Sequence, residues 1–443
     1  MTIGHDSRAA WTRALPPLLV SLLLLPAFVL GVEKVVLGGL GMGCFAALVW
    51  WRPVCALLVL LLAMPLAPKI HLPIGNLYVS TVLVMAFVVL SVFKKIANPA
   101  PLRFARAPVS SPLLFLAAAL TLSVTMNVSH LLANREQLLR FVQFLFYLSL
   151  FFFAADTRLE PRHRRWIIGA ILATGVLEGA IATLQWISKA GFFTTGTFDH
   201  QHNHLAAYLV FTGLLLMGVI LEAPSARSRV PLLCGLGLIG FGLVFSFSRT
   251  GYIALVAGML SFLVLRIARR KKLAVLSLLF LGVLLAYLLV PGSVAKRAGT
   301  IAVVAAGKAQ RDISFSIRLE MWSTAIEAFK SSPLLGVGAM KFEMRDNYFV
   351  KTLAESGALG MIALIWVIGS VLSQGVRSSR LAAGDRLLRG ARIGFVPASF
   401  ALLVVFNMSG DFMNLHRLMG VFWILVPVLT SSPEREPGPD EGR

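Results

Sequence analysis

The sequence predicts an all-α polytopic membrane protein, and two observations lead to this prediction. Of the 443 residues, 57% are hydrophobic and only 14% are charged, whereas soluble domains usually carry about a quarter charged residues. Apolar runs also recur along the whole chain. Each is long enough to cross about 30 Å of hydrocarbon as a helix that rises about 1.5 Å per residue. The lipid bilayer is therefore the expected solvent for most of the protein.

We expect about 12–14 transmembrane helices. The second and third candidates are separated only by Trp51-Arg52-Pro53, so they form either two spans or one re-entrant hairpin. The candidate spans cover residues 15–32, 35–51, 53–67, 76–93, 110–126, 138–155, 166–187, 203–221, 230–247, 250–265, 273–290, 353–374, 391–410 and 417–430.

The positions of Lys and Arg predict the orientation of these spans. Membrane proteins concentrate positive residues in their short cytoplasmic loops. With a cytoplasmic N-terminus, 25 of the 41 Lys and Arg residues fall on the cytoplasmic side, and nine of the other 16 lie in one long loop that the rule exempts. The same rule accounts for the net charge of +21. Because no basic run is interleaved with base-stacking aromatic residues, nucleic acid is not an expected partner.

The long loop covers residues 291–352 on the extracytoplasmic side, and loops of such length are usually functional or disordered. Ile317, Met321, Ala325 and Phe329 recur at helical spacing, which predicts a short helix against the membrane face. Ser316 is a candidate N-cap of that helix. Ser332-Pro333 is expected to end it, and Gly336-Val-Gly338 is expected to form a turn.

Four polar clusters interrupt the apolar pattern, and the predicted topology places all of them on the extracytoplasmic side. Their convergence on one face predicts a functional site. They are Gly196–Ala206 with His200, His202, Asn203 and His204; Ser246–Gly251 with Ser246, Ser248 and Arg249; Arg318 with Glu320 and Trp322; and Arg345, Asp346 and Asn347 followed by Glu355.

Arg249 lies between two apolar segments, and two interpretations are open. A guanidinium group can bind diphosphate with paired hydrogen bonds and stays charged at any working pH. Alternatively, the side chain reaches the headgroup layer as a snorkelling arginine.

The alternating histidines at positions 200, 202 and 204 suggest a metal site, because imidazole is a common ligand. However, residues i and i+2 do not share a helix face. The other interpretations are contacts with sugar hydroxyls or phosphate, or plain polarity at the start of a helix. We expect neither a metal nor another cofactor.

Two acidic residues are further candidates. Asp346 lies beside Arg345 at a wet membrane face, where it can accept a hydroxyl proton as a general base or cap the next helix. Glu178 is an intramembrane acid, a type of residue that is functional by default, but its depth predicts a position away from the four clusters.

Motifs for nucleotide binding are missing from the sequence. It has no G-x-x-x-x-G-K-[ST] loop and no cytoplasmic domain large enough to hold a nucleotide sugar. Any glycosyl donor must therefore be lipid-linked.

The polar segments resemble the O-antigen ligase and O-antigen polymerase family. The resemblance rests on the order and spacing of four motifs between about residues 190 and 375. These are Gly196-Thr-Phe followed by Asn203, Ser246-x-Ser-Arg-x-Gly251, Arg318-x-x-x-Trp322 with Pro333-Leu-Leu-Gly-Val-Gly338, and Asn347 with Glu355-Ser-Gly-Ala-Leu-Gly360.

The resemblance implies a glycosyltransferase of cell-surface polysaccharide biosynthesis in the bacterial inner membrane, active at the periplasmic face. Such an enzyme takes a saccharide from an undecaprenyl diphosphate carrier, transfers it to a glycan or glycolipid acceptor, and needs neither nucleotide nor metal. Arg249 and Arg318 are then expected to hold the diphosphate, and Asp346, or a histidine of the first cluster, to act as the base. The residues expected to bind substrate are His200, His202, Asn203, His204, Ser246, Ser248, Trp322, Arg345, Asn347 and Glu355.

Two departures from the ligase pattern argue against strict ligase chemistry, and the Asp-Asn form resembles the polymerase branch. Ligases of this family carry His-Asn at the entry to the span after the long loop, where this chain has Asp346-Asn347. They also carry an arginine shortly before Gly-Thr-Phe, where this chain has Phe193. One alternative is an O-antigen ligase that joins polysaccharide to lipid A-core. Another is a transporter or flippase for lipid-linked saccharides, although the chain shows no internal repeat of the kind common in transporters.

Composition and the resemblance together suggest how the chain is organised. A tail rich in Pro, Glu and Gly is expected to be disordered in the cytoplasm. The expected units are an N-terminal transmembrane bundle (1–189), a core resembling the family (190–375, including the loop 291–352), C-terminal transmembrane helices (376–430) and the tail (431–443).

Overall fold

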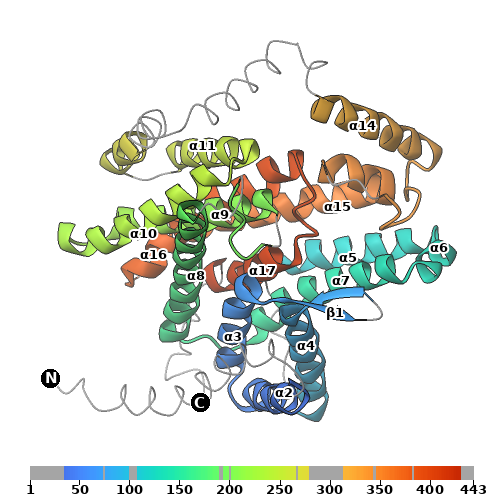
Figure 1. Ribbon diagram of the computed structural model, residues 1–443, viewed down its shortest axis with the longest axis horizontal. Coiled ribbons are helices and arrows are strands. Elements are labelled where there is room, and N and C mark those ends of the chain that lie inside the picture. The colour runs from blue at the N-terminus through green and yellow to red at the C-terminus, as the bar shows by residue number, and fades with distance from the viewer. Residues whose placement is uncertain are drawn as a thin grey trace, which may run out of the picture.

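The computed structural model shows a bundle of α-helices with one short β-hairpin (Figure 1). This architecture confirms the predicted all-α polytopic fold. The candidate span 15–32, most of 273–290 and the C-terminal tail lie outside the described part of the chain. The structure describes residues 34–72, 75–98, 107–188, 193–198, 201–265, 268–278, 313–342, 346–381 and 384–430.

Within the described residues, seven helices are long and apolar enough to cross a membrane. They are α4 (Val79–Ala97), α7 (Arg135–Asp156), α8 (Pro161–Ile187), α9 (His202–Glu222), α10 (Ala226–Phe245), α15 (Tyr348–Ser379) and the continuous segment Arg386–Met408. That last segment begins as α16 (Arg386–Phe400) and continues as the π-helical turn η3 (Ala401–Val405) and the 3-10 turn η4 (Phe406–Met408).

Shorter apolar helices occupy further predicted spans. They are α2 (Lys34–Trp51), α3 (Pro53–Leu66), α5 (Ser110–Thr125), α11 (Arg249–Val264) and α17 (His416–Thr430), and the six-residue α6 (Val128–Ala133) precedes α7.

The hairpin between α3 and α4 was not expected from the sequence. Its strands β1 (Lys69–Leu72) and β2 (Gly75–Tyr78) are antiparallel, with Lys69 opposite Tyr78. Strands of four residues are too short for an alternating apolar pattern to stand out beside the neighbouring spans.

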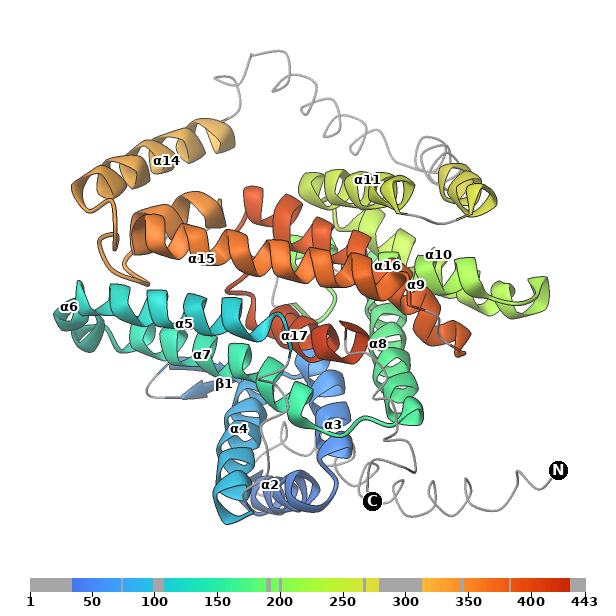
Figure 2. The same ribbon diagram turned by 180° about the vertical axis from the view of Figure 1, so that it is seen from behind.

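Helix α9 lies at the centre of the bundle (Figures 1 and 2). Of its most apolar 18-residue stretch, 94% is buried inside the protein. It packs most closely on α16, where glycines of the two helices meet. A Cβ atom at Gly218 would lie 2.3 Å from the carbonyl oxygen of Gly390, and one at Gly394 would lie 2.6 Å from that of Leu214. Small residues let helix backbones approach closely inside a membrane. This contact fixes α9 and therefore the polar residues at its N-terminus.

Helix α14 (Ile313–Ser331) lies across the outer side of α15, away from the rest of the bundle (Figures 1 and 2). It confirms the predicted helix in the long loop and ends where Ser332-Pro333 was expected to end it. Its start was predicted wrongly, because Ser316 lies inside the helix and cannot be its N-cap. Ala325 of α14 and Ala354 of α15 are fully buried against each other.

Helix α15 is interrupted at Gly357, whose φ of 63° and ψ of −159° are not helical. The predicted turn at Gly336–Gly338 is present, with positive φ at both glycines, and its segment fills the gap. The amide of Ala358 donates to the carbonyl of Pro333 at 2.8 Å, and that of Val337 donates to the carbonyl of Ala354 at 2.9 Å. Because a membrane offers no water, such groups must find partners within the protein.

The interruption of α15 leads to a stability prediction. Gly357→Ala should lower the free energy of unfolding by about 1–3 kcal/mol, the usual cost of a strained backbone conformation. The added Cβ would also lie 2.4 Å from the carbonyl oxygen of Leu334. The unfolding midpoint of the purified protein in detergent measures this effect.

Gly369→Ala is the matched control in the same helix. A Cβ at Gly369 would meet nothing within 4 Å, and Ala is the better helix former by about 1 kcal/mol, so this variant should be as stable as the parent or slightly more stable. Equal effects of the two substitutions would contradict the proposed role of Gly357.

Candidate functional site

The turn between η4 and α17, residues 409–415, contacts three of the four predicted polar clusters. The hydroxyl of Ser409 donates to the hydroxyl of Thr250 at 2.8 Å. The ring of Phe412 lies edge-on to that of His204, with centroids 6.0 Å apart. The amide of Tyr348 donates to the carbonyl of Gly410 at 3.2 Å. The starts of α9, α11 and α15 therefore meet at this turn, which we call the 409–415 turn.

The second cluster begins α11 and is tied to the first. Ser248 is the N-cap of α11, since its hydroxyl oxygen accepts the amide of Gly251 at 3.1 Å. The same hydroxyl donates to the side-chain carbonyl of Asn203 at 2.7 Å. Arg249, the first residue of α11, is therefore held beside the first turn of α9 and is half-buried.

The two serines of the Ser-x-Ser motif have different roles. Ser246 is fully buried, and its hydroxyl donates to the carbonyl of Leu243 at 2.6 Å. It therefore closes the end of α10 and has no exposed surface for a substrate, contrary to the expectation from the sequence. Phe247, between the two serines, has a φ of 53°, which lets the chain turn sharply into α11.

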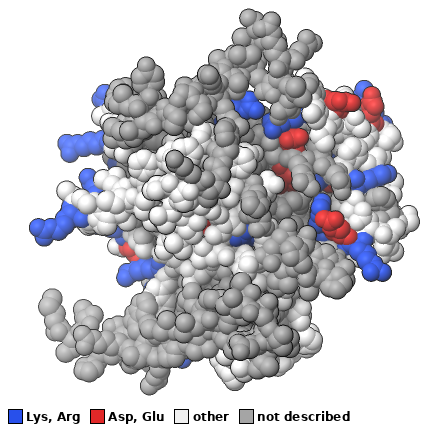
Figure 3. Space-filling model, viewed as in Figure 1, with Lys and Arg blue, Asp and Glu red and all other residues white. Residues whose placement is uncertain are grey.

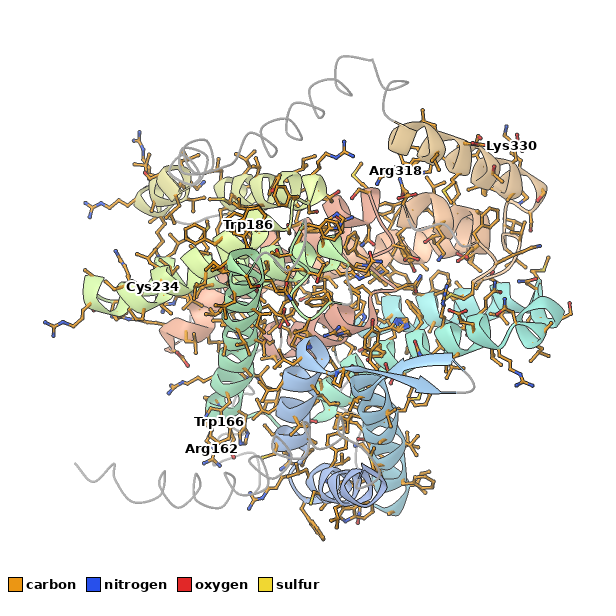
Figure 4. The ribbon with its side chains drawn as sticks, in the orientation of Figure 1. Arg162, Trp166, Trp186, Cys234, Arg318 and Lys330 are labelled. Carbon is orange, nitrogen blue, oxygen red and sulfur yellow. The ribbon has the colours of Figure 1, made fainter. Side chains whose placement is uncertain are left out.

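The third and fourth clusters form an ion pair. The Nε of Arg318 lies 3.2 Å from a carboxylate oxygen of Asp346, with the side chains 30% and 26% exposed. Figure 4 shows Arg318 on the side of α14 that faces α15. Trp322, one turn further along α14, packs against the buried contact between α14 and α15. The structure thus brings together two residues that the sequence proposed for diphosphate binding and for catalysis.

The N-cap of α15 is Asn347 and not Asp346. The side-chain oxygen of Asn347 accepts the amides of Phe349 at 3.0 Å and Val350 at 3.2 Å. The alternative interpretation of Asp346 as the cap of this helix is therefore wrong. Because Asn347 satisfies the first turn, the carboxylate of Asp346 is available to Arg318.

Glu355 faces the protein interior, where it organises the chain between α14 and α15. Only 5% of Glu355 is exposed. Its carboxylate accepts the amide of Phe342 at 2.9 Å, and its carbonyl accepts the amide of Gly338 at 3.0 Å and the hydroxyl of Ser123 at 2.5 Å. These contacts make it a positioning residue for the segment that leads to Asp346. They leave no exposed carboxylate for the substrate contact expected from the sequence.

The two described histidines of the first cluster point to different neighbours. The ring of His202 lies 4.7 Å from that of Phe193, whereas His204 contacts Phe412. In the described part of the chain, no three His, Cys, Asp or Glu side chains gather as a metal site would require. His200 and Arg345, which the sequence also proposed as substrate contacts, lie outside the described residues.

The Gly196-Thr197 loop is held by buried polar groups that the sequence analysis did not connect. Glu178 accepts the amide of Thr197 at 3.1 Å, and Gln185 accepts the amide of Gly196 at 2.9 Å. The guanidinium of Arg417 donates to the carbonyl of Thr197 at 2.9 Å and also to Met64 and Pro65 of α3. Glu178 was thus wrongly separated from the first cluster, which it anchors.

A second buried ion pair lies beside the 409–415 turn. The ammonium of Lys351 is 2.7 Å from the carboxylate of Asp411, with both side chains about nine-tenths buried. Sequence reasoning missed Asp411 and its neighbours. The available signal was a short polar interruption between two apolar runs, which contains Asn407, Asp411, Asn414, His416 and Arg417.

Charged residues are distributed differently over the two ends of the bundle. Arg162 and Trp166 lie at one end of α8 and Trp186 lies toward the other (Figure 4). Arg165 pairs with Asp385, and Lys271 pairs with Glu222. In Figure 3 most of the visible acidic side chains lie toward α14, whereas the opposite edge shows mainly Lys and Arg.

The site therefore combines three features that suit an anionic substrate. Arg249 and Arg318 supply guanidinium groups, and the N-termini of α9, α11 and α15 add their partial positive charge. Asp346 supplies a carboxylate that can accept a proton. All three features come from segments that the hydrogen bonds and ion pairs above hold in place.

Comparisons with known proteins show that part of this site lies in a segment similar to a known family. Residues 234–365 match the family described as O-antigen ligase, a range that includes Arg249, Arg318 and Asp346. The chain is 28% identical over 236 residues to a protein of Pseudomonas aeruginosa named O-antigen ligase. The matched region covers 50% of this chain and 54% of the relative. The chain thus spans about half the length of the curated relative it matches. These matches confirm the resemblance to the O-antigen ligase family that the four sequence motifs predicted.

Proposed function

We propose that the protein transfers a saccharide from a lipid-linked diphosphate donor to an acceptor hydroxyl at the extracytoplasmic face of the bacterial inner membrane. The observation that carries this proposal is that the starts of α11 and α15 both contact the 409–415 turn. The start of α11 carries Arg249, and Asp346 directly precedes α15 and pairs with Arg318. The family match supports an enzyme of the O-antigen ligase type.

In the proposed reaction, the acceptor oxygen attacks the anomeric carbon of the donor sugar. The bond between that carbon and the diphosphate breaks, and the diphosphate leaves with the electron pair. The acceptor proton passes to the carboxylate of Asp346. Arg249 and the helix N-termini stabilise the charge that develops on the leaving group.

The geometry of Arg318 allows it to contact both Asp346 and the diphosphate of the donor. Its Nε group faces Asp346, and a guanidinium has five N–H donors. The donors on the two terminal nitrogens are then available for phosphate oxygens. Arg318 would thereby hold Asp346 next to the bond that breaks.

The charge asymmetry of the loops supports the proposed orientation of the site. Arg162 lies on one side, as a residue of a cytoplasmic loop would, whereas Arg318 lies on the opposite side (Figure 4). A cysteine at Ser331, with the three native cysteines replaced, should react in intact cells with an impermeant thiol reagent. Reaction only after lysis would contradict this orientation.

The two candidate functions, polymerase and ligase, differ in the acceptor that receives the saccharide. The Asp346-Asn347 pair favours a polymerase that joins one lipid-linked saccharide to another, and Phe193 departs from the ligase pattern. The names of the matched family and relative favour a ligase that joins polysaccharide to lipid A-core. We propose the polymerase and keep the ligase as the second candidate.

The first prediction for this site concerns Arg249. Arg249→Ala should reduce product formation by about 10²-fold or more, the usual cost of losing a group that stabilises the leaving charge. Arg249→Lys should recover little, because an ammonium cannot make the paired contacts of a guanidinium. Transfer is measured in proteoliposomes that contain the purified protein and a labelled lipid-linked donor.

Arg227→Ala is the matched control for Arg249, since it removes the same charge from the exposed start of α10. It should leave transfer unchanged. Normal transfer by Arg249→Ala, at an equal amount of protein in the membrane, would show that this arginine only reaches the headgroup layer. Movement of the donor across the bilayer without transfer would favour the flippase.

The second prediction concerns Asp346. Asp346→Asn should lower transfer by about 10²-fold or more, because the amide cannot accept the proton. Folding should be almost unaffected: Asn347 caps the helix, and a partly exposed ion pair contributes only about 0–1 kcal/mol. Asn347→Ala should show the opposite pattern, with a loss of about 1 kcal/mol of stability. Unchanged activity in Asp346→Asn would assign the base to another residue.

The third prediction separates polymerase from ligase in a deletion strain. Loss of a polymerase should leave single repeat units attached to the final carrier and no long chains. Loss of a ligase should leave long chains on the lipid carrier that never reach the acceptor. Gel analysis of surface glycans and extracted lipid-linked glycans distinguishes the two, and long lipid-linked chains would overturn the polymerase proposal while leaving the family resemblance intact.

A further inference from the structure

Helix α11 has a single exposed face, and Arg249 lies at one end of it. Every residue of α11 (Arg249–Val264) is described, and only four of them are exposed, all apolar. They are Ile253 (47% exposed), Val256 (38%), Leu260 (45%) and Val264 (85%). Counted from Arg249, they follow at intervals of three or four residues, which is the spacing of one helix face. We call these four residues the α11 stripe.

The opposite face of α11 is held against the centre of the bundle. The helix packs on α9, α16 and η3, and two of its glycines allow a close approach. A Cβ atom at Gly258 would lie 2.4 Å from Cδ1 of Leu214, and one at Gly251 would lie 2.9 Å from the Cβ of Ala206. The α11 stripe therefore faces away from α9, at the edge of the bundle where α11 lies (Figures 1 and 2).

The face that begins at Arg249 is longer than one leaflet of the bilayer. From Arg249 to Val264 it extends about 22 Å along the helix axis, since a helix rises about 1.5 Å per residue. One leaflet supplies about half of the hydrocarbon thickness of about 30 Å. Beyond Arg249 no charged residue of α11 interrupts the face. A chain that followed it from Arg249 would remain in apolar surroundings past the middle of the membrane.

The chemistry of the proposed donor connects this face to the site. The diphosphate of a lipid-linked donor is bonded directly to its hydrocarbon chain. A donor whose diphosphate binds Arg249 must therefore place the first part of its chain next to that residue. Ile253, one turn from Arg249 on the same face, is the first apolar surface that α11 offers to this chain.

An exposed apolar face alone does not select a particular lipid, because lipid tails are as apolar as leucine. The selection comes from Arg249, whose guanidinium can hold a diphosphate with charge-assisted hydrogen bonds. Ile362 of α15 illustrates the difference. It is 59% exposed, but it lies within a span and not one turn from a residue proposed for the diphosphate.

From this arrangement we infer that the hydrocarbon chain of a polyprenyl diphosphate follows the α11 stripe from Arg249 into the bilayer. The inference rests on the proposed function, which it deepens by assigning the chain of the carrier to one helix face. The length of the face suits a chain that extends beyond one leaflet.

Photo-cross-linking tests this path. Photoreactive benzoylphenylalanine replaces Ile253 or Val264, and the protein is reconstituted into vesicles of phosphatidylethanolamine and phosphatidylglycerol. One radiolabelled probe is a long-chain polyprenyl diphosphate without sugar, and the other is geranyl diphosphate, whose chain is much shorter than the stripe. The long probe should label both positions. Geranyl diphosphate should label position 253 but not position 264, because its chain cannot reach that far from Arg249.

Benzoylphenylalanine at Ile362 is the matched control, since that position is also apolar and exposed. It should give phospholipid adducts but no labelling by the probe above background. Arg249→Ala should lower labelling at both stripe positions by about tenfold or more, the usual effect of losing a charge-assisted hydrogen bond. Equal labelling at positions 264 and 362, no effect of Arg249→Ala, or stripe adducts only with phospholipid or a second copy of the chain would overturn the inference.

The cross-linking result is independent of transfer, because the probe carries no saccharide. Stripe adducts that depend on Arg249, in a protein that transfers no sugar, would support the path and reject the proposed function. Transfer that depends on Arg249 and Asp346, without probe adducts at either stripe position, would support the function and reject the path.

Discussion

In hydrocarbon, an unpartnered backbone amide is so unfavourable that a helix can be interrupted only where another segment supplies the missing hydrogen bonds. In α15 the interruption lies at Gly357, and the segment Pro333–Gly338 supplies them. This contact ties the end of α14 to the first third of α15. The Arg318–Asp346 pair bridges the same two helices, so its geometry depends on this backbone contact.

Buried charges serve the same purpose elsewhere in the bundle. Lone charges are costly inside a membrane, but here each has specific partners. Arg417 and Glu178 hold the loop before α9 through Thr197, and Lys351 and Asp411 connect α15 to the 409–415 turn. Removing one member would leave the other buried without compensation. We interpret both sets as braces that fix the helix starts around the site.

The sequence predicted the helices and their polar ends more fully than the contacts between them. Apolar runs marked α9, α10, α11 and α15, and helical spacing marked α14, because burial in lipid leaves a local pattern. The partner of Thr197 was not predictable, since Glu178 and Arg417 are distant in sequence. The N-cap of α15 was ambiguous because Asp346 and Asn347 are adjacent and both residue types cap helices well.

The motifs that carry the family resemblance fall into two physical groups. Gly336, Gly338, Glu355 and Gly357 are committed to closing the interruption of α15, and Ser246 closes α10. Such residues indicate a shared fold and give no information about the acceptor substrate. Arg249, Arg318 and Asp346 are not needed for backbone closure, so they are the positions where chemistry can differ within one fold. A histidine in place of Asp346 would not form a carboxylate–guanidinium pair with Arg318, which would leave that arginine free to carry its full charge to the proposed diphosphate. The departure at Asp346 therefore changes the electrostatic balance of the site while leaving its framework unchanged.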